Sequence, residues 1–203
     1  MSIKNIVFDV GNVLVRWEPL AIVNRVFNEE IYPQELVAKI FKSSIWYKLN
    51  LGTITEKEAI VLYNQELGIS NSKLQELMDV IKESLVPIDG SISLLNELYM
   101  LKFPLYCITD NIKELVDFLK NKYDFFYKFS GVVVSADLGV LKPNPLMYTH
   151  LSDSYSLVPS ETVFIDDLLV NIQGAINLGW HGIVFTSPED CRLQLKNLGV
   201  KIK

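Results

Sequence analysis

The alternation of short apolar runs with helical patterns limits the possible folds of this chain more than any other feature. From Pro87 onward, four apolar runs are separated by stretches with helical periodicity, at residues 105–109, 131–135, 162–166 and 182–186. The run Ile6-Val7-Phe8 near the start has the same character. Strands that alternate with helices are typical of a parallel sheet with helices on both faces. We therefore predict an α/β fold with a doubly wound parallel sheet.

The long segment between the first two predicted strands shows only helical periodicity. Thr55 begins the sequence Thr-Glu-Lys-Glu, which is typical of a helix N-terminal capping box, and Gly68 is a stop signal for the same helix. We predict about four helices in this segment. They form a helical cap over residues 16–86, inserted into an α/β catalytic core made of residues 1–15 and 87–203.

Composition narrows the classes of partner. The net charge is −5 and the Lys and Arg residues form no basic run, so nucleic acid is not an expected partner. No segment approaches the roughly 18 uninterrupted apolar residues of a membrane span. Cys107 and Cys191 have no metal-ligand spacing and indicate no disulfide framework. We expect a cytoplasmic protein without a membrane partner, and the sequence leaves its oligomeric state open.

Polar residues stand at the ends of the predicted strands, where a turn alone would not require them. The carboxyl ends of parallel strands meet at one edge of the sheet, which is where open α/β sheets bind ligands. These ends would supply carboxylates, a hydroxyl and an ammonium group from Asp9, Thr109, Asp110, Lys142, Asp166 and Asp167. Clustered carboxylates repel one another unless a cation lies among them, and hard oxygen ligands favour Mg²⁺. An aspartate at such a site can attack phosphorus and form an acyl phosphate.

Four short motifs, taken in order, resemble those of the haloacid dehalogenase-like (HAD) hydrolase superfamily. They are Phe8–Val13, Ile108–Asn111, Leu141–Pro143, and Phe164–Asp167 with Asn171. The resemblance covers nearly the whole chain. It is nearest to the branch with a helical cap between the first two motifs, which includes bacterial sugar-phosphate phosphatases and the phosphatase domain of soluble epoxide hydrolase. It implies Mg²⁺-dependent hydrolysis of a small phosphorylated metabolite, a sugar phosphate above all, through an aspartyl-phosphate.

The resemblance also implies roles for single residues around the metal. Asp9 would be the nucleophile and a Mg²⁺ ligand, and Gly11 would offer its main-chain carbonyl to the metal. Asp167 would bind the metal directly, and Asp166 would bind it directly or through water. Asn171 would orient one of these two carboxylates from behind.

A second set of roles concerns the phosphate. Thr109 would bind it through its hydroxyl, and Asp110 through its backbone N–H. Lys142 would neutralise charge on both Asp9 and the phosphoryl oxygens. The turn that contains Gly11 and Asn12 would contribute to the same phosphate site.

Two residues depart from the pattern of the superfamily. Most of its phosphatases have an aspartate at the position of Gly11, where it serves as general acid and base. The loss of a general acid typically costs about 10²–10⁴-fold in rate. The leaving group is therefore expected to need little help, as in a sugar phosphate linked at the anomeric carbon or an acyl phosphate. Asp110 stands where close relatives usually have asparagine.

Three other functions remain open at the level of the sequence. A carbon–halogen hydrolase would also use an attacking aspartate but would not need the pair Asp166-Asp167. A phosphoaccepting receiver would carry its acidic pair before the acceptor and would lack a cap. A non-catalytic phosphate-binding or scaffold protein would keep the site without turnover.

Other polar and aromatic residues are interpreted as structural. His150 and His181 are not spaced as metal ligands or as a catalytic dyad. Trp46, Tyr47 and Arg16 lie in the cap segment and could face the cleft, but a core or surface role is favoured for each.

Overall fold

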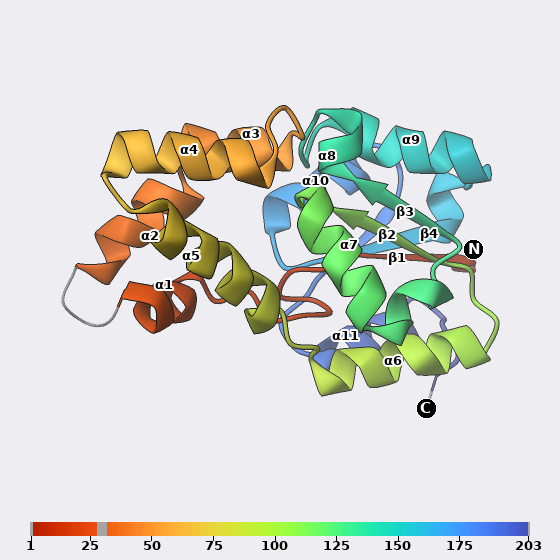
Figure 1. Cartoon of the computed structure of the whole chain (residues 1–203). Coiled ribbons are helices and arrows are strands. Elements are labelled where there is room, and N and C mark those ends of the chain that lie inside the picture. Colours follow the sequence, from red (N-terminus) through yellow and green to blue (C-terminus); the bar gives the residue numbers. More distant parts are fainter. Residues whose placement is uncertain (1, 28–31, 203) are drawn as a thin grey trace.

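A computed structural model describes residues 2–27 and 32–202 (Figure 1). Its centre is a five-stranded sheet in the order β3-β2-β1-β4-β5, and each neighbouring pair is parallel. The strands are β1 (Asn5–Phe8), β2 (Leu105–Thr109), β3 (Gly131–Val134), β4 (Thr162–Asp166) and β5 (His181–Val184). The central strand β1 pairs with β2 on one side and with β4 on the other. The doubly wound α/β fold is confirmed.

Helices cover both faces of the sheet. Successive side chains of a strand point to opposite faces, and β1 shows this division: Ile6 and Phe8 belong to one buried cluster and Val7 to another. On the first face pack α6 (Asp89–Met100), α7 (Lys113–Lys122) and α11 (Pro188–Asn197). On the second pack α9 (Pro145–Tyr155) and α10 (Leu169–Ile176). The short elements are α8 (Ser135–Leu138), η1 (Asp124–Lys128) and η2 (Pro159–Glu161).

The segment between β1 and β2 contains five helices within the described residues, rather than about four. They are α1 (Pro19–Phe27), α2 (Pro33–Phe41), α3 (Ser44–Asn50), α4 (Glu56–Leu67) and α5 (Asn71–Ser84). The short α3 is a separate helix because the Ser43 side chain caps it. The predicted capping box at Thr55 is present, and Gly68 ends α4 in the left-handed conformation. These helices gather beyond the carboxyl ends of the strands (Figure 1).

Two connecting segments lead into and out of this helical part, and they pair with each other. The backbone N–H of Arg16 donates to Val86 O at 2.9 Å, and that of Ile88 donates to Leu14 O at 2.8 Å. Between these bonds Val15 and Pro87 form an antiparallel bridge. We call Leu14–Arg16 and Val86–Ile88 the paired connectors.

The helical part also touches the core at the loop between α3 and α4. Gly52 has a φ of +67°, and a Cβ added there would lie 2.1 Å from the carbonyl oxygen of Ala136 in α8. The hydroxyl of Ser135 donates to Asn50 O at 2.7 Å. This loop is therefore seated directly on α8.

Some boundaries and faces differ from the sequence predictions. β3 ends at Val134, because Ser135 already begins α8. The apolar periodicity of α10 assigns Leu169 and Ile176 to its buried face, but they are 65% and 44% exposed. The polar Asn171 is buried in their place, where it bonds to Asp166. No helix among the described residues has both the length and the apolarity needed to span a membrane.

Candidate active site

The loop after β1 is a tight turn held by hydrogen bonds from backbone and side chain. The backbone N–H groups of Leu14 and Val15 both donate to Val10 O. Asn12 adopts a left-handed conformation, with φ of 53°, which asparagine tolerates better than most residues. Its side-chain oxygen accepts from the backbone N–H of Trp17 at 3.0 Å, and its amide donates to Asp167 at 3.3 Å. The turn therefore links the end of β1 to Asp167 after β4 and to Trp17 at the start of the helical segment.

Asp9 and Lys142 form a buried ion pair at the carboxyl edge of the sheet. Lys142 Nζ lies 2.8 Å from Asp9 Oδ1 and 2.7 Å from Asp166 Oδ2. Burial alone would lower the pKa of Lys142, but the carboxylates of Asp9, Asp166 and Asp110 outweigh it and raise that pKa. Lys142 is therefore a fixed cation.

The carboxyl group of Asp9 is held in an environment that opposes its charge. Burial raises the pKa of Asp9 to about 7, because the attraction of Lys142 only partly offsets burial and the repulsion of Asp166 adds to it. A buried carboxylate of this kind is stabilised by an additional cation.

The two acids at the end of β4 have different surroundings. Asp166 is fully buried and accepts hydrogen bonds from the backbone N–H of Leu168 at 2.8 Å and from the Asn171 amide at 3.0 Å, besides its pair with Lys142. Asp167 is half-buried, lines the cavity and accepts a hydrogen bond from the Asn12 amide. Burial raises the pKa of Asp167. The carboxylate of Asp166 is thus bound by groups of the protein, whereas the carboxylate of Asp167 faces the cavity and is available to a ligand.

Asp9, Asp166 and Asp167 converge on one point. Each offers a carboxylate oxygen, and these oxygens lie within 4.8 Å of one another. Lys142 is the ammonium group that pairs with two of the three. Three carboxylates against one ammonium leave a local excess of negative charge that a bound cation would relieve.

The end of β2 contributes Asp110, in a way that the sequence did not indicate. Both carboxylate oxygens of Asp110 accept from the backbone N–H of Lys142, at 3.0 and 3.2 Å. The side chain thus fixes the segment that carries the lysine. Burial raises the pKa of Asp110 against the attraction of Lys142. Thr109 is buried at the end of β2 and is not among the residues that line the cavity.

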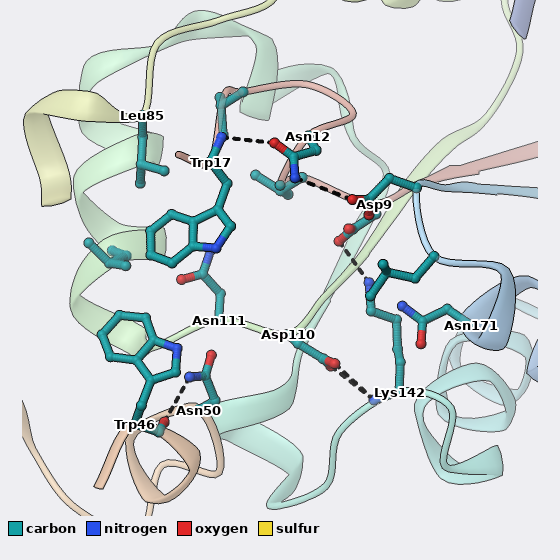
Figure 2. Close-up of a pocket in the computed structure, with 16 residues that line it drawn as sticks. Asp9, Asn12, Trp17, Trp46, Asn50, Leu85, Asp110, Asn111, Lys142 and Asn171 are labelled. Carbon is teal, nitrogen blue, oxygen red and sulfur yellow. Dashed lines mark hydrogen bonds and ion pairs between the residues drawn. The ribbon is translucent and has the colours of Figure 1, made fainter. Parts of the chain in front are cut away.

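A cavity of about 280 Å³ opens in front of these groups. Asp9, Lys142 and Asn171 lie on one side, and Trp17, Trp46 and Leu85 lie on the other (Figure 2). Trp46 packs against the apolar core cluster, the role that the sequence favours, and it also lines the cavity. Tyr47 is 55% exposed and does not line it.

Several further residues that line the cavity were not among the predicted site residues. They are Val15, Trp17, Asn50, Leu85, Asn111, Leu115 and Leu168. For Trp17, Asn50 and Leu85 the contribution depends on how the helical segment is placed against the sheet, and periodicity does not determine this placement. Gly11 and Asn12, which the motif assigns to the phosphate turn, line the cavity, whereas neither histidine does.

The fold and the acidic site define a hydrolase of the haloacid dehalogenase type, and comparison with known proteins agrees. The family model for haloacid dehalogenase-like hydrolases matches residues 3–179, so the chain belongs to this family. A sesquiterpene phosphatase of Aspergillus oryzae is 24% identical over 97% of both chains. A flavin mononucleotide hydrolase of Arabidopsis thaliana is 23% identical over 97% of this chain and 78% of its own length.

A solved structure has the same fold. It is a HAD family enzyme from Bacteroides thetaiotaomicron, in complex with magnesium and inorganic phosphate. The TM-score is 0.75 at 20% identity, over 91% of this chain and 95% of that one. At this identity the likeness concerns the fold.

Proposed function

We propose that this chain is a Mg²⁺-dependent phosphatase that hydrolyses a small phosphorylated metabolite through an aspartyl-phosphate at Asp9. One observation carries the proposal: the Asp9 carboxylate lies 2.8 Å from a buried ammonium group and within 4.8 Å of two further carboxylates, beside a cavity. Such a site suits the simultaneous binding of a divalent cation and a phosphate dianion.

The residues present fit magnesium. The donors are hard oxygens, and the raised pKa of Asp9 reflects an environment in which an added cation would stabilise the charged carboxylate. Asp9, Asp167 and the main-chain carbonyl of Gly11 would hold the ion, and Asp166 would join directly or through water. When bound, Mg²⁺ would neutralise charge on the carboxylates and the phosphate. The magnesium and phosphate in the Bacteroides structure support this assignment.

In the proposed reaction a carboxylate oxygen of Asp9 attacks phosphorus. A new O–P bond forms while the bond from phosphorus to the leaving oxygen breaks, and the leaving alkoxide takes a proton from water. Water then cleaves the acyl phosphate and regenerates Asp9. Lys142 would neutralise the developing charge, while the backbone N–H of Asp110 would bind a phosphoryl oxygen, with Asn12 in the adjoining turn. The contact predicted for the Thr109 hydroxyl stays a prediction, because Thr109 is buried beside the cavity and does not line it.

A further group of residues would maintain this geometry. Asn171 holds Asp166 through its amide, and Asp166 in turn holds Lys142. We assign residues 16–86 to a cap and residues 1–15 and 87–203 to the catalytic core. The cap would cover the cavity and exclude water during the reaction.

The substrate class is less constrained than the reaction. The resemblance of the motifs favours a sugar phosphate, whereas the names of the two relatives point to a sesquiterpene phosphate and to flavin mononucleotide. A phosphate-release assay on a panel that includes these classes, with Mg²⁺ or with chelator, tests the proposal. We expect release only with the metal.

The matched variants are Asp9→Asn and, as a control, Asp153→Asn, which makes the same chemical change at an exposed position. We expect Asp9→Asn to abolish turnover and Asp153→Asn to retain it. Unchanged turnover in Asp9→Asn would sink the mechanism. Metal-independent halide release would select the dehalogenase alternative, and phosphate binding without turnover would select the scaffold alternative.

A further inference from the structure

The wall of the cavity that faces Asp9 carries no charge. Within the described residues, the helical segment contributes Trp17, Trp46, Asn50 and Leu85 to the lining. The charged lining residues all come from the core, at the phosphate end: Asp9, Asp110, Lys142 and Asp167. No cation therefore faces the part of a substrate that extends away from the phosphate. A leaving group with a second phosphate or a carboxylate would be buried there without a partner.

The uncharged wall is aromatic and braced. The rings of Trp17 and Trp46 stack at 5.8 Å between centroids, with an interplanar angle of 15°. Phe41 packs edge-on against both rings, at 5.3 and 5.0 Å. The pair is therefore a preformed apolar surface that needs little reordering when a ligand binds.

The polar groups on this side are few, and part of each is already used. The Asn50 amide donates to Trp46 O at 2.8 Å, and its backbone carbonyl accepts from Ser135. The side-chain oxygen of Asn111 accepts from the backbone N–H of Ile112. Several sugar hydroxyls would thus meet too few partners, and a buried hydroxyl without a partner is unfavourable.

The apolar character continues from the cavity onto the surface. Leu168 lines the cavity and is 52% exposed. The next two residues at the start of α10, Leu169 and Val170, are 65% and 57% exposed. Three consecutive exposed apolar side chains at the mouth of a site are unusual for a solvated surface. They give an apolar tail a path out of a cavity whose volume lies at the low end of ligand pockets.

We infer that the leaving group is an uncharged apolar alcohol or phenol, held between the Trp17–Trp46 pair and Leu168 at the cavity mouth, and not a polyhydroxylated sugar; of the two, a phenol also suits a site that has no acid at Gly11. This inference rests on the proposed phosphatase function. In the overall reaction, the monoester and one water give the free alcohol and inorganic phosphate.

The test compares two esters with the same kind of leaving oxygen: hexyl phosphate and a hexose phosphate linked at its primary hydroxyl. Both release a primary alkoxide, so a difference in kcat/KM reports recognition of the organic group. We expect the Mg²⁺-loaded wild type to favour hexyl phosphate by about 10-fold or more. Equal values, or preference for the sugar ester, would overturn the inference alone. No turnover of these esters or of p-nitrophenyl phosphate would overturn the proposed function and the inference with it.

Substitutions at Trp46, on the uncharged wall, and at Leu168, at the cavity mouth, test whether these residues cause the preference for apolar esters. Trp46→Gln should lower the hexyl-to-hexose ratio by about 10-fold, mainly through a higher KM for the apolar ester. Tyr47→Gln is the matched control, because Tyr47 follows Trp46 on α3 but does not line the cavity. Leu168→Gln changes an exposed side chain, so folding is not at stake, and it should lower the preference for dodecyl over hexyl phosphate. Unchanged ratios in both variants would contradict the inference.

Discussion

The absence of a general acid at residue 11 is not imposed by the backbone. Gly11 does not have a positive φ, and a Cβ added there would meet only Trp17 Cβ, at 3.9 Å. A side chain therefore fits at this position, and the local geometry does not require glycine. The absence of an aspartate at this position is therefore a chemical difference from the family pattern, and it is not required by the packing around residue 11.

Restoring the acid is the first prediction. Gly11→Asp should raise kcat on simple alkyl phosphates by about 10-fold or more, because their alkoxides leave poorly without protonation. The gain should be smaller on sugar phosphates linked at the anomeric carbon, whose leaving groups need less help. Steady-state rates on both substrate classes check this. Gly11→Ala fills the same space without a carboxyl group and serves as control, and equal gains on the two classes would refute the leaving-group explanation.

The second prediction concerns the pH dependence of stability in the metal-free protein. Burial raises the pKa of Asp9 from its ordinary value of 3.8 to about 7. The folded state therefore binds this proton more tightly than the unfolded state, so stability is lost as pH rises from 3.8 to 7. Asp9→Asn has no such proton. Relative to wild type, its free energy of unfolding should rise across this window, by on the order of 1 kcal/mol or more.

Urea denaturation with chelator at several pH values measures this difference. The pKa values of Asp110 and Asp167 are also raised, but these residues are present in both proteins and their contribution cancels to first order. Curves that stay parallel from acid to neutral pH would show that Asp9 is not held in a destabilised charged state.

At the scale of elements, the loop between α3 and α4 fixes how the helical segment sits on the core. Gly52 and Gly68 have similar φ values, +67° and +69°, but only Gly52 has a close neighbour, the carbonyl of Ala136. Alanine at either position would have to adopt the left-handed conformation, which destabilises the folded state by about 1–2 kcal/mol. Only Gly52→Ala also forces the loop away from α8.

We therefore predict that Gly52→Ala lowers the melting temperature more than Gly68→Ala does. It should also raise KM, because the lining residues Trp46 and Asn50 lie directly before this loop. Thermal unfolding and steady-state kinetics of both variants make the comparison. Equal effects of the two substitutions would mean that the contact with Ala136 does not position the helical segment.

How far the sequence predicts these elements depends on whether the signal is local. The five strands and the α4 capping box follow from periodicity and from residues within one turn, and both were predicted. The buried face of α10 was predicted only in part: Ile172 and Ala175 are buried, whereas Leu169 and Ile176 are exposed. Asn171, which the motif but not the apolar periodicity places near the acidic pair, turns inward to bond with Asp166, which is a contact with another element. The role of the Asp110 side chain could not be predicted for the same reason, because its hydrogen-bond partner, the backbone N–H of Lys142, is 32 residues away in the sequence. The direction of Trp46 depends on where the helical segment rests.

At the scale of the whole molecule, the site lies at the junction of the two parts of the chain. The core supplies the charged groups and the helical segment supplies the uncharged wall. Binding of a cation to the folded state but not to the unfolded chain raises the free energy of unfolding, by an amount that grows with the logarithm of the cation concentration once this exceeds the dissociation constant. The carboxylate cluster should therefore couple metal binding to unfolding of the chain.

This coupling gives the fourth prediction. Mg²⁺ at about 100 times its dissociation constant should stabilise the wild type by about 2.7 kcal/mol, and the melting temperature should rise accordingly. Asp167→Asn should lose most of this shift, because Asp167 is the half-buried acid that faces the cavity. Asp137→Asn is a control, since this exposed acid on α8 lies outside the cluster. Identical metal-induced shifts in wild type and Asp167→Asn would exclude the proposed ligand.

The paired connectors have a consequence for how such a chain can diversify. The helical segment begins and ends at the paired connectors, Leu14–Arg16 and Val86–Ile88, which are hydrogen-bonded to each other. One continuous stretch of gene between these points can thus be exchanged for another of different length without a change in the order or register of the sheet. The carboxylates and the lysine would stay in place while the organic part of the substrate changed. In this architecture, the residues proposed to carry out the reaction can therefore be retained while the residues proposed to select the substrate change.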